Sequence, residues 1–288
     1  MAAVPGDAGR RPPTSIRTHG RSVTAGTYVA LSLAAVLALA PFFFLMVTAF
    51  THTYVEQVAI GKLAHPTLAN FRDIFSQTPF AHWLFNSFVV ATATTVLVLF
   101  VDSLAGYAFA KKKFAGRDVI FFMLLSTQMI PIPVTILPLF LLATRMGLID
   151  SYYALILPAV AVPIGVFMMR QFIKTIPSEL EEAARIDGLG DLAIYWRIIL
   201  PLCVPALALL GFFTFFLSWT SLLWPLLVAT SDHTRTVPPG LATLVGQYIT
   251  NYGQISAGAV LSILPMVVVF VLLGRQLARG LVSRTVKG

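Results

Sequence analysis

The sequence predicts an all-α protein that crosses a membrane several times. Of its 288 residues, 57% are hydrophobic and 11% are charged, and the mean hydropathy is +0.84. Soluble domains carry about 25% charged residues. A helix needs about 20 apolar residues to cross the hydrocarbon core, because lipid offers no partner for exposed backbone groups. Six segments meet this requirement: residues 28–50, 85–110, 119–143, 153–172, 198–230 and 257–277.

The first segment has an alternative interpretation as a cleavable signal peptide, since arginines precede it and residues 38–40 read Ala-Leu-Ala. Its apolar run continues through PFFFLMVTAF, well beyond the roughly 7–15 residues of a cleavable core. We therefore expect a retained span. The sequence then divides into a disordered cytoplasmic tail (1–24), a six-helix membrane domain (25–279) and a second cytoplasmic tail (280–288).

Lysine and arginine predict the orientation, because they accumulate in short cytoplasmic loops. Sixteen of the twenty basic residues fall on one side of the six spans, in the N-terminal tail, the second-to-third loop, the fourth-to-fifth loop and the C-terminal tail. The other four are Lys62, Arg72, Arg145 and Arg235. Both termini are therefore expected in the cytoplasm. This distribution also accounts for the net charge of +8 without a nucleic-acid partner.

The polar residues of the spans give little support for catalysis or metal binding. All five histidines lie outside the apolar runs, and the sole cysteine, Cys203, lies within one. A lone cysteine has no partner for an internal disulfide and no neighbour at metal-ligand spacing. We expect a thiol packed in the core, no catalytic residue, no metal site and no cofactor bound by this chain. No Gly-rich phosphate-binding loop occurs in it either.

The loop between the fourth and fifth spans is unusually acidic, with carboxylates at positions 179, 181, 182, 187 and 191. Ser178 and Glu181 have the spacing of a capping box, which predicts a helix start. Gly188 can take the left-handed conformation that ends such a helix, and Gly190 with Asp191 allows a turn into a second short helix. The prediction is a helix-turn-helix near residues 178–197 on the cytoplasmic side.

Two interpretations of this loop compete. An amphipathic helix resting on the membrane surface would present basic residues to anionic lipid. Here the polar face leads with Glu179, Glu181 and Glu182, and Leu180, Ala183 and Ala184 form an apolar face of mostly small residues. Such a helix is better suited to docking in a groove of a partner protein.

The same loop resembles a known family. The stretch EAARIDGLGDLAIYWRIILP matches the EAA motif of ATP-binding-cassette (ABC) importer permeases at Glu182, Ala183, Ala184, Gly188, Ile198, Leu200 and Pro201. The resemblance implies a type I importer permease fold in which this segment is the coupling helix that sits in a cleft of a cytoplasmic ATPase. It assigns that contact to Glu182, Ala183, Ala184, Asp187, Gly188 and Gly190, with Glu182 facing a basic residue of the ATPase.

Further stretches are similar to the carbohydrate branch of this family, in particular its maltose-type second membrane subunit. They are residues 70–91, 105–118, 137–158 and 167–188, together with the C-terminal RTVKG. By this resemblance Val286, Lys287 and Gly288 reach into an ATPase dimer that binds ATP and Mg²⁺. A second homologous permease, an extracytoplasmic binding protein and a carbohydrate complete the implied partners, in the cytoplasmic membrane of a prokaryote. The outer loops, about residues 51–84 and 231–256, would receive the binding protein.

The sequence departs from this family where the substrate path is expected. Trp219, Thr220 and Ser221 stand where Trp-Asn and an acidic residue are usual, so known substrate contacts do not transfer. Candidates for the path are Gln128, Thr220 and Ser221, with the ring of Trp219 or Trp224 for a sugar face. Helix-to-helix hydrogen bonding and interfacial Trp placement explain the same residues equally simply. Asp102 allows two interpretations. It either has a functional role or a partner within the span, or it reaches water or the nearby lysines.

The expected function is thus a pore subunit of an ATP-driven sugar or oligosaccharide importer. Import of glycerol phosphates, polyols or amino sugars by the same family is the main alternative. An ion-coupled secondary transporter would show internal repeats or midplane carboxylates, and Asp102 alone supports it weakly. An intramembrane enzyme would need a nucleophile with its base or paired acids.

Overall fold

The computed structural model describes residues 25–51, 66–160, 162–245 and 250–282, with side chains up to residue 274. Within these ranges the chain is helical and contains no β-strand, which confirms the all-α class. Three helices are long and apolar enough to cross a membrane, and six spans result if each of three bent helix pairs counts as one. The N-terminal tail predicted at 1–24 lies outside the described residues.

Helix α1 (Ala25–Ala49) corresponds to the first predicted span and continues through Pro41. It belongs mostly to a unit of residues 1–44 that is separate from the unit formed by residues 45–288. Its side chains from residue 26 to residue 44 are exposed although the helix is apolar on every face, which suits a helix surrounded by lipid. Its last turn belongs to the second unit, where Asn70 Nδ2 donates to the carbonyl oxygens of Ala49 (2.9 Å) and Thr51 (2.8 Å).

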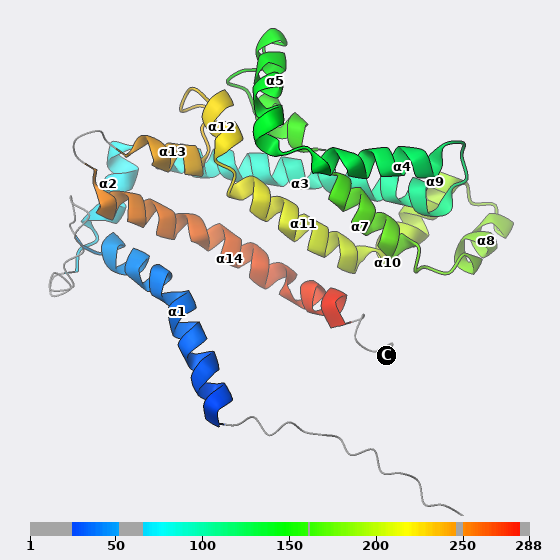
Figure 1. Ribbon diagram of the computed structural model, residues 1–288, viewed down its shortest axis with the longest axis horizontal. Helices are drawn as coiled ribbons and strands as arrows, with labels where there is room; N and C mark the ends of the chain where they lie inside the picture. The colour runs from blue at the N-terminus through cyan, green and yellow to red at the C-terminus, as the bar shows by residue number, and fades with distance from the viewer. Residues whose placement is uncertain (1–24, 52–65, 161, 246–249, 283–288) are drawn as a thin grey trace, which may run out of the picture. The chain divides into compact units, whose positions relative to one another are not determined.

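Helix α3 (Phe80–Lys111) is the central element of the second unit (Figure 1). It packs most extensively on α7 (Pro163–Ile173) and α11 (Val204–Trp219). α11 packs in turn on α14 (Tyr252–Val282), which also contacts α2 (Ala69–Gln77). Close approach of α3 and α7 requires Gly106, because a Cβ there would lie 2.6 Å from Met169 Cβ.

Three predicted spans are bent rather than continuous. The third consists of α4 (Arg117–Ser126) with a 3₁₀ turn (Thr127–Met129), and α5 (Ile132–Arg145), at 100° to each other. The fourth joins α6 (Tyr152–Ile156) with its 3₁₀ turn (Leu157–Ala159) to α7 at 46°. The fifth joins residues 191–202 to α11 at 78° and is followed by α12 (Leu223–Val228). Proline explains these breaks, since Pro131, Pro163 and Pro205 stand at or beside the new helix starts.

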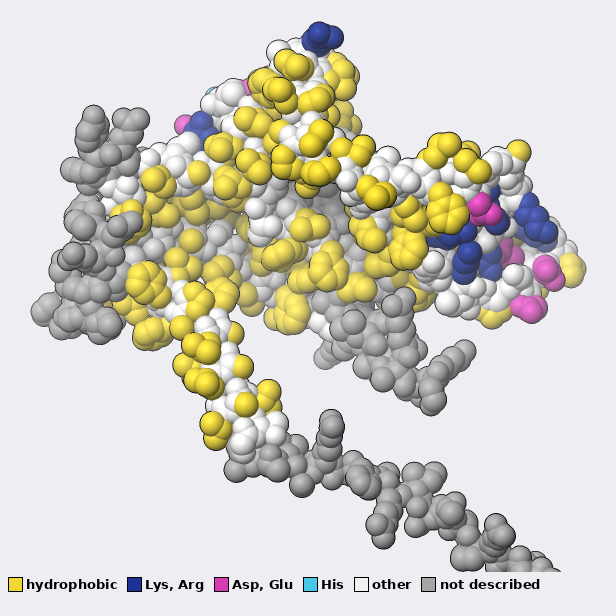
Figure 2. Space-filling model, in the orientation of Figure 1, with side chains coloured by type: hydrophobic (Ala, Val, Ile, Leu, Met, Phe, Trp, Pro, Cys, Tyr) yellow, Lys and Arg dark blue, Asp and Glu magenta, His cyan; other side chains and the backbone are white. Residues whose placement is uncertain are grey.

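Short helices complete the two ends of the second unit. α8 (Glu179–Ile186) and α9 (Asp191–Ile194) lie beyond α7, at the end of the unit where α3 also ends (Figure 1). α13 (Val237–Thr243) and α12 lie near the start of α3. Figure 2 shows charged side chains gathered around α8 and α9, while hydrophobic side chains cover most of the remaining surface in view. One cysteine, Cys203, is fully buried in the core near α8 and α9, as expected.

Candidate functional site

Helix α8 begins differently from the sequence prediction. The Ser178 side chain accepts no capping hydrogen bond, and the residue already has helical backbone angles. Its carbonyl oxygen accepts hydrogen bonds from the backbone N–H groups of Glu181 (3.0 Å) and Glu182 (3.1 Å). The predicted capping box is therefore wrong. The capping box does not form because the Glu181 carboxylate turns toward α3 instead of back toward the helix start.

Glu181 is the only buried carboxylate of α8, at 3% exposure. Its Oε1 lies 3.3 Å from Lys111 Nζ, and its Oε2 lies 3.7 Å from Arg185 Nη2. Tyr107 donates its hydroxyl to Oε2 at 3.3 Å. A buried charge is strongly unfavourable unless it is paired and hydrogen-bonded. Glu181 is thus an internal contact between α8 and α3, and we name the group Glu181, Lys111 and Tyr107 the inner clamp.

Further contacts tie the flanks of α8 to the end of α3. Lys111 Nζ donates to the Ile176 carbonyl oxygen (2.6 Å) just before α8, and Lys112 Nζ lies 2.5 Å from Asp191 Oδ1 just after it. Arg185 Nη2 reaches the same Asp191 oxygen at 3.4 Å. The segment from 176 to 191 is therefore held to α3 at its beginning, middle and end.

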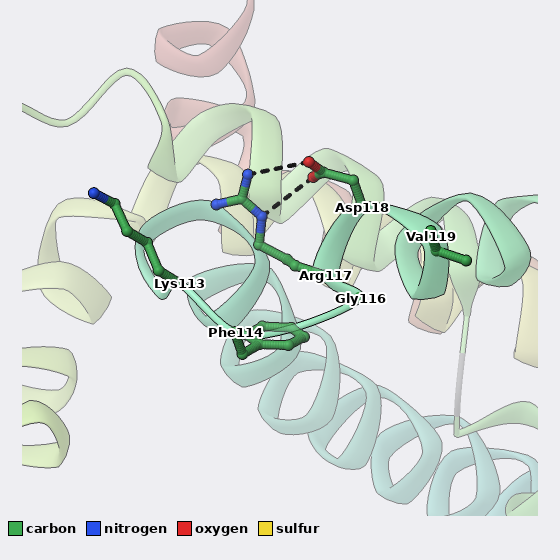
Figure 3. Close-up of a pocket in the computed structure, with 6 residues that line it drawn as sticks. All are labelled: Lys113, Phe114, Gly116, Arg117, Asp118 and Val119. Atoms are coloured by element: carbon green, nitrogen blue, oxygen red, sulfur yellow. Dashed lines mark hydrogen bonds and ion pairs between the residues drawn. The ribbon is translucent and has the colours of Figure 1, made fainter.

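The end of α7 that leads into α8 is also fixed to its neighbours. Arg170 is 9% exposed, donates to the Phe109 carbonyl oxygen (3.3 Å) and lies 3.4 Å from Asp118 Oδ1. Its guanidinium stacks 3.9 Å from the centre of the Phe121 ring. Figure 3 shows Asp118 also paired with Arg117, beside an open pocket of about 480 Å³ in the loop between α3 and α4.

The outward face of α8 carries most of the sequence-predicted docking residues. The exposed ones are Glu182, Ala183, Asp187, Gly188 and Gly190. Ala184 differs, since it is 5% exposed and packs in the core beneath α8, so that prediction of an outward contact is not supported. Ile186 was not selected from the sequence, yet it is 88% exposed, the highest value among the large apolar residues of the described chain. Its only sequence signal was an apolar residue on the polar side of an amphipathic helix.

The predicted end of α8 at Gly188 is confirmed. Gly188 has a φ of +84°, in the left-handed region that favours glycine. Its N–H donates to the Arg185 carbonyl oxygen (3.0 Å), and the Leu189 N–H donates to that of Ala184 (2.9 Å). These two bonds define a Schellman motif, with the Leu189 and Ala184 side chains in the same apolar cluster. The exposed face thus ends at a fixed turn.

The second short helix is confirmed in position but has an unexpected geometry. α9 is followed by a π-helical turn (Tyr195–Ile199) and a final turn, α10 (Leu200–Leu202). The Tyr195 hydroxyl lies 2.7 Å from Ser103 Oγ of α3. Ile194, Tyr195 and Ile199 are all buried in the core beneath α8. This packing connects α8 to the fifth span through a buried element.

The candidate substrate-path residues occupy different environments. Trp219 is 4% exposed, donates to the Ser262 carbonyl oxygen (3.1 Å) and stacks on Phe215, so its ring is part of the contact between α11 and α14. Thr220 is exposed and bonds back to its own helix. Ser221 is half-buried, and Gln128 is exposed on the 3₁₀ turn after α4. The Trp224 indole donates to the Ala154 carbonyl oxygen (2.8 Å). A packing role therefore accounts for both tryptophans.

Asp102 lies fully buried between α3 and α7, and not beside water or the lysines. A Cβ at Gly165, in the first turn of α7, would lie 2.0 Å from Asp102 Oδ2. The glycine therefore makes room for the carboxylate at the start of α7. Asp102 thus lies at the contact between α3 and the start of α7, where a helix dipole favours a negative group.

At the opposite end of α3, polar side chains hold the loop between α12 and α13. Asn86 Nδ2 donates to the carbonyl oxygens of His233 (3.0 Å) and Arg235 (2.9 Å), and Tyr152 donates to Asn86 Oδ1 (2.6 Å). Ser87 Oγ accepts the N–H of Val237 at 2.8 Å. We name Asn86, Tyr152 and Ser87 with residues 231–237 the outer clamp.

A carboxylate from the turn before α6 supports the same loop. Asp150 has a positive φ of 60° and accepts hydrogen bonds from the Ser231 N–H (3.0 Å) and the Thr234 hydroxyl. Burial alone would raise the pKa of this carboxyl, but the hydrogen bonds from residues 231 and 234 outweigh burial and lower it to about 2. Asp150 is therefore ionised at neutral pH and holds the loop as an anion.

The arrangement defines a class of protein: a multi-span helical membrane protein with an exposed acidic helix between two spans. Residues 102–287 match the family of the binding-protein-dependent transport system inner membrane component, and the chain belongs to this family. Family membership makes it a multi-pass permease subunit of an ABC importer and not its ATPase. The tail contacts predicted at Val286, Lys287 and Gly288 lie outside the described residues.

Similar proteins agree with this assignment. The arabinooligosaccharides transport system permease protein AraQ of Halalkalibacterium halodurans is 41% identical over 77% of this chain and 80% of its own. The lactose transport system permease protein LacG of Rhizobium radiobacter is 35% identical over 89% and 94%. The sn-glycerol-3-phosphate permease protein UgpE of Yersinia enterocolitica is 35% identical over 89% and 95%.

A solved structure shows the same fold. A chain of a bacterial ABC transporter involved in the import of the acidic polysaccharide alginate superposes with a TM-score of 0.77. The match covers 87% of this chain and 94% of that chain at 22% identity. The ABC importer permease fold predicted from the sequence is thereby confirmed.

Proposed function

We propose that this permease imports a sugar or oligosaccharide. The outward face of α8 docks on a separate cytoplasmic ATPase and moves with it when that subunit binds and hydrolyses ATP. The observation that carries the coupling proposal is the exposed face formed by Glu182, Ala183, Ile186 and Asp187. An 88% exposed isoleucine beside two carboxylates is unfavourable in water and suits an amphipathic groove with basic residues at its rim. ATP and Mg²⁺ would be bound by the ATPase and not by this chain.

The substrate class rests on the similar proteins. Two of those described are named for arabinooligosaccharide and lactose transport, which supports a carbohydrate. The relative named for sn-glycerol-3-phosphate keeps a glycerol phosphate as the alternative. Polyols and amino sugars remain within the same proposal. Gln128, Thr220 and Ser221 are the proposed polar contributors to the path, and Trp219 is the weakest of the original candidates because of its burial.

The proposed assembly contains an ATPase dimer, a second homologous permease and an extracytoplasmic binding protein, with both termini of this chain in the cytoplasm of a prokaryote. The basic residues concentrated near α8 support this orientation. The loop held by the outer clamp then faces the binding protein. The C-terminal residues 286–288 are proposed to contact the ATPase.

Co-purification of the tagged chain from its native membrane tests the assembly. We expect mass spectrometry to identify an ATPase and a second permease. Recovery of the chain alone, or only as a homo-oligomer, in gentle detergent would contradict the proposal. Screening the accompanying binding protein against arabinooligosaccharides, lactose and glycerol 3-phosphate would then separate the two substrate classes.

Charge reversal tests the docking face. Glu182→Lys should leave insertion and expression normal while reducing substrate uptake at least tenfold, because a lysine would face the basic rim of the groove. Lys113→Glu is the matched control, since Lys113 is exposed and has no ion-pair partner within the described residues. Wild-type uptake by Glu182→Lys would contradict the assignment of this face.

A further inference from the structure

Helix α3 is held by polar side chains at both of its ends. The inner clamp joins Lys111 and Tyr107 to Glu181 of α8, and the outer clamp joins Asn86 and Ser87 to residues 231–237. The 32 residues of α3 span about 48 Å at 1.5 Å per residue. The two clamps therefore lie at opposite faces of the membrane domain on one continuous helix.

The cytoplasmic end cannot move independently of α8 without losing several buried contacts. Lys111 and Glu181 have side-chain exposures of only 8% and 5%, so separating them would leave two charges away from water. Lys111 also holds the Ile176 carbonyl oxygen, and Arg170 holds that of Phe109. Displacement of α8 should therefore displace the end of α3.

Close packing along α3 opposes sliding against its neighbours. A Cβ at Gly106 would meet Met169, and Ser103 lies 2.7 Å from the Tyr195 hydroxyl. Near the outer end, a Cβ at Gly240 would lie 2.3 Å from the Trp83 ring, and the Trp83 indole donates to Asp232 at 3.1 Å. Densely packed interiors move as units and switch between discrete arrangements.

The geometry points to α3 as the element that transmits movement of the docking helix to the outer loop 231–237, with Glu181 and Asn86 as the positioning residues at its two ends. This inference rests on the proposed function of α8. It separates two adjacent glutamates: Glu182 contacts the ATPase, and Glu181 passes the resulting displacement into α3. Because coupling is reciprocal, a change in the outer loop also alters ATP hydrolysis.

A double-mutant cycle tests this connection. The complete co-purified transporter is placed in lipid nanodiscs, and its rate of Mg-ATP hydrolysis is measured without added substrate. Asn86→Ala, which releases the outer loop, should raise that rate at least threefold. In the Glu181→Gln background the same change should alter the rate by less than 1.5-fold, because the inner connection is then broken.

The long distance between the two substituted sites lets the double-mutant cycle distinguish coupled from independent effects. Asn86 and Tyr107 are 21 residues apart on one helix, or about 30 Å, whereas independent sites more than about 10 Å apart usually give additive effects. Multiplicative effects of the two substitutions on the hydrolysis rate would overturn the inference. So would an unchanged rate in Asn86→Ala. If that variant folds poorly, Tyr152→Phe replaces it, because it removes only the hydroxyl that bonds to Asn86 Oδ1.

Charge exchange distinguishes a specific inner connection from general damage. Glu181→Gln and Lys111→Glu should each abolish at least two-thirds of the response to Asn86→Ala, and the exchange Lys111→Glu with Glu181→Lys should restore at least half of it. Lys113→Gln is the matched control and should keep the full response. Failure of the exchange to restore any response would contradict the role of the pair.

The composition of the purified complex separates failure of this inference from failure of the proposed function. A wild-type preparation that contains no ATPase contradicts the proposed function itself. A Glu181→Gln preparation that loses its ATPase assigns Glu181 to the docking contact and overturns its positioning role. Retention of the ATPase with loss of the Asn86 response supports transmission through α3.

Discussion

Two adjacent glutamates of α8 have opposite environments. Glu181 is 3% exposed against α3, whereas Glu182 faces outward. The sequence indicated an acidic docking helix but not this division, because the partners that hold Glu181 against α3, Tyr107 and Lys111, lie 74 and 70 residues earlier in the chain. Local capping rules consider only neighbours in sequence. Tertiary pairing with Lys111 outweighed the local hydrogen bond.

This difference predicts different effects on stability. Glu181→Gln should lower the free energy of unfolding by about 3 kcal/mol, because Lys111 would keep a buried charge without its partner. Glu182→Gln should change it by less than about 0.5 kcal/mol, as is usual for exposed sites. Thermal unfolding of the two purified variants in the same detergent checks this. Equal melting temperatures would contradict the buried contact.

Asp150 gives a prediction about pH. Its pKa in the folded protein is about 2, below the value of about 3.9 expected in an unfolded chain. The stabilisation from its hydrogen bonds is therefore fully present above about pH 4 and is lost as the pH falls toward 2. Asp150→Asn should be less stable than wild type by about 1 kcal/mol at pH 6, after allowance for solvent screening.

The difference between Asp150→Asn and wild type should then shrink between pH 4 and pH 2, as the wild-type carboxylate becomes protonated. Hydrogen exchange of residues 231–237, measured at several pH values, follows the loop directly. A difference that stays constant down to pH 2 would show that Asp150 does not act through its charge.

At the scale of the element, proline and glycine decide where helices bend and how closely they approach. The sequence predicted all six apolar segments, and each corresponds to a helix or a bent helix pair. It did not predict the 100° bend after Met129, because hydropathy along a segment is blind to its direction. Proline alone does not locate the bends, since Pro41 and Pro265 lie inside continuous helices. Packing against neighbours decides which prolines bend a helix.

Two helical glycines should respond in opposite ways to alanine. Gly106→Ala should destabilise the protein by about 1–3 kcal/mol, because its Cβ would lie 2.6 Å from Met169 Cβ. Gly274→Ala should stabilise it by up to about 1 kcal/mol, because a Cβ there meets no atom within 4 Å and alanine favours the helix. Thermal unfolding of both variants provides the comparison. A neutral Gly106→Ala would contradict close packing of α3 on α7.

At the scale of the whole molecule, the distribution of charge predicts the orientation, and the motif predicted the family that the comparisons confirm. Both followed from the sequence because they depend on short, continuous segments. The inner and outer clamps did not, since Lys111 with Glu181 and Asn86 with Arg235 join segments far apart in the chain. The exposure of Ile186 also required the structure, because a helical period alone left the burial of a single apolar residue in an acidic helix undetermined.

Cysteine labelling tests the orientation in whole cells. Lys113→Cys, exposed in the loop between α3 and α4, should react with a membrane-impermeant maleimide only after the cells are opened, and His233→Cys should react from outside. The chain's own Cys203 is fully buried and serves as the internal negative control. Labelling of Lys113→Cys in intact cells would contradict the proposed topology.

The π-helical turn at Tyr195–Ile199 also sets an angular relationship across the molecule. A π turn contains one residue more than the equivalent α turn, and one residue of an α-helix corresponds to about 100° of rotation. Deleting a single residue there would therefore rotate everything that follows by roughly that angle relative to α8. The faces that α11 presents to α3 and α14 would exchange buried for lipid-facing residues. The extra residue thus sets the rotation of the last two spans relative to α8.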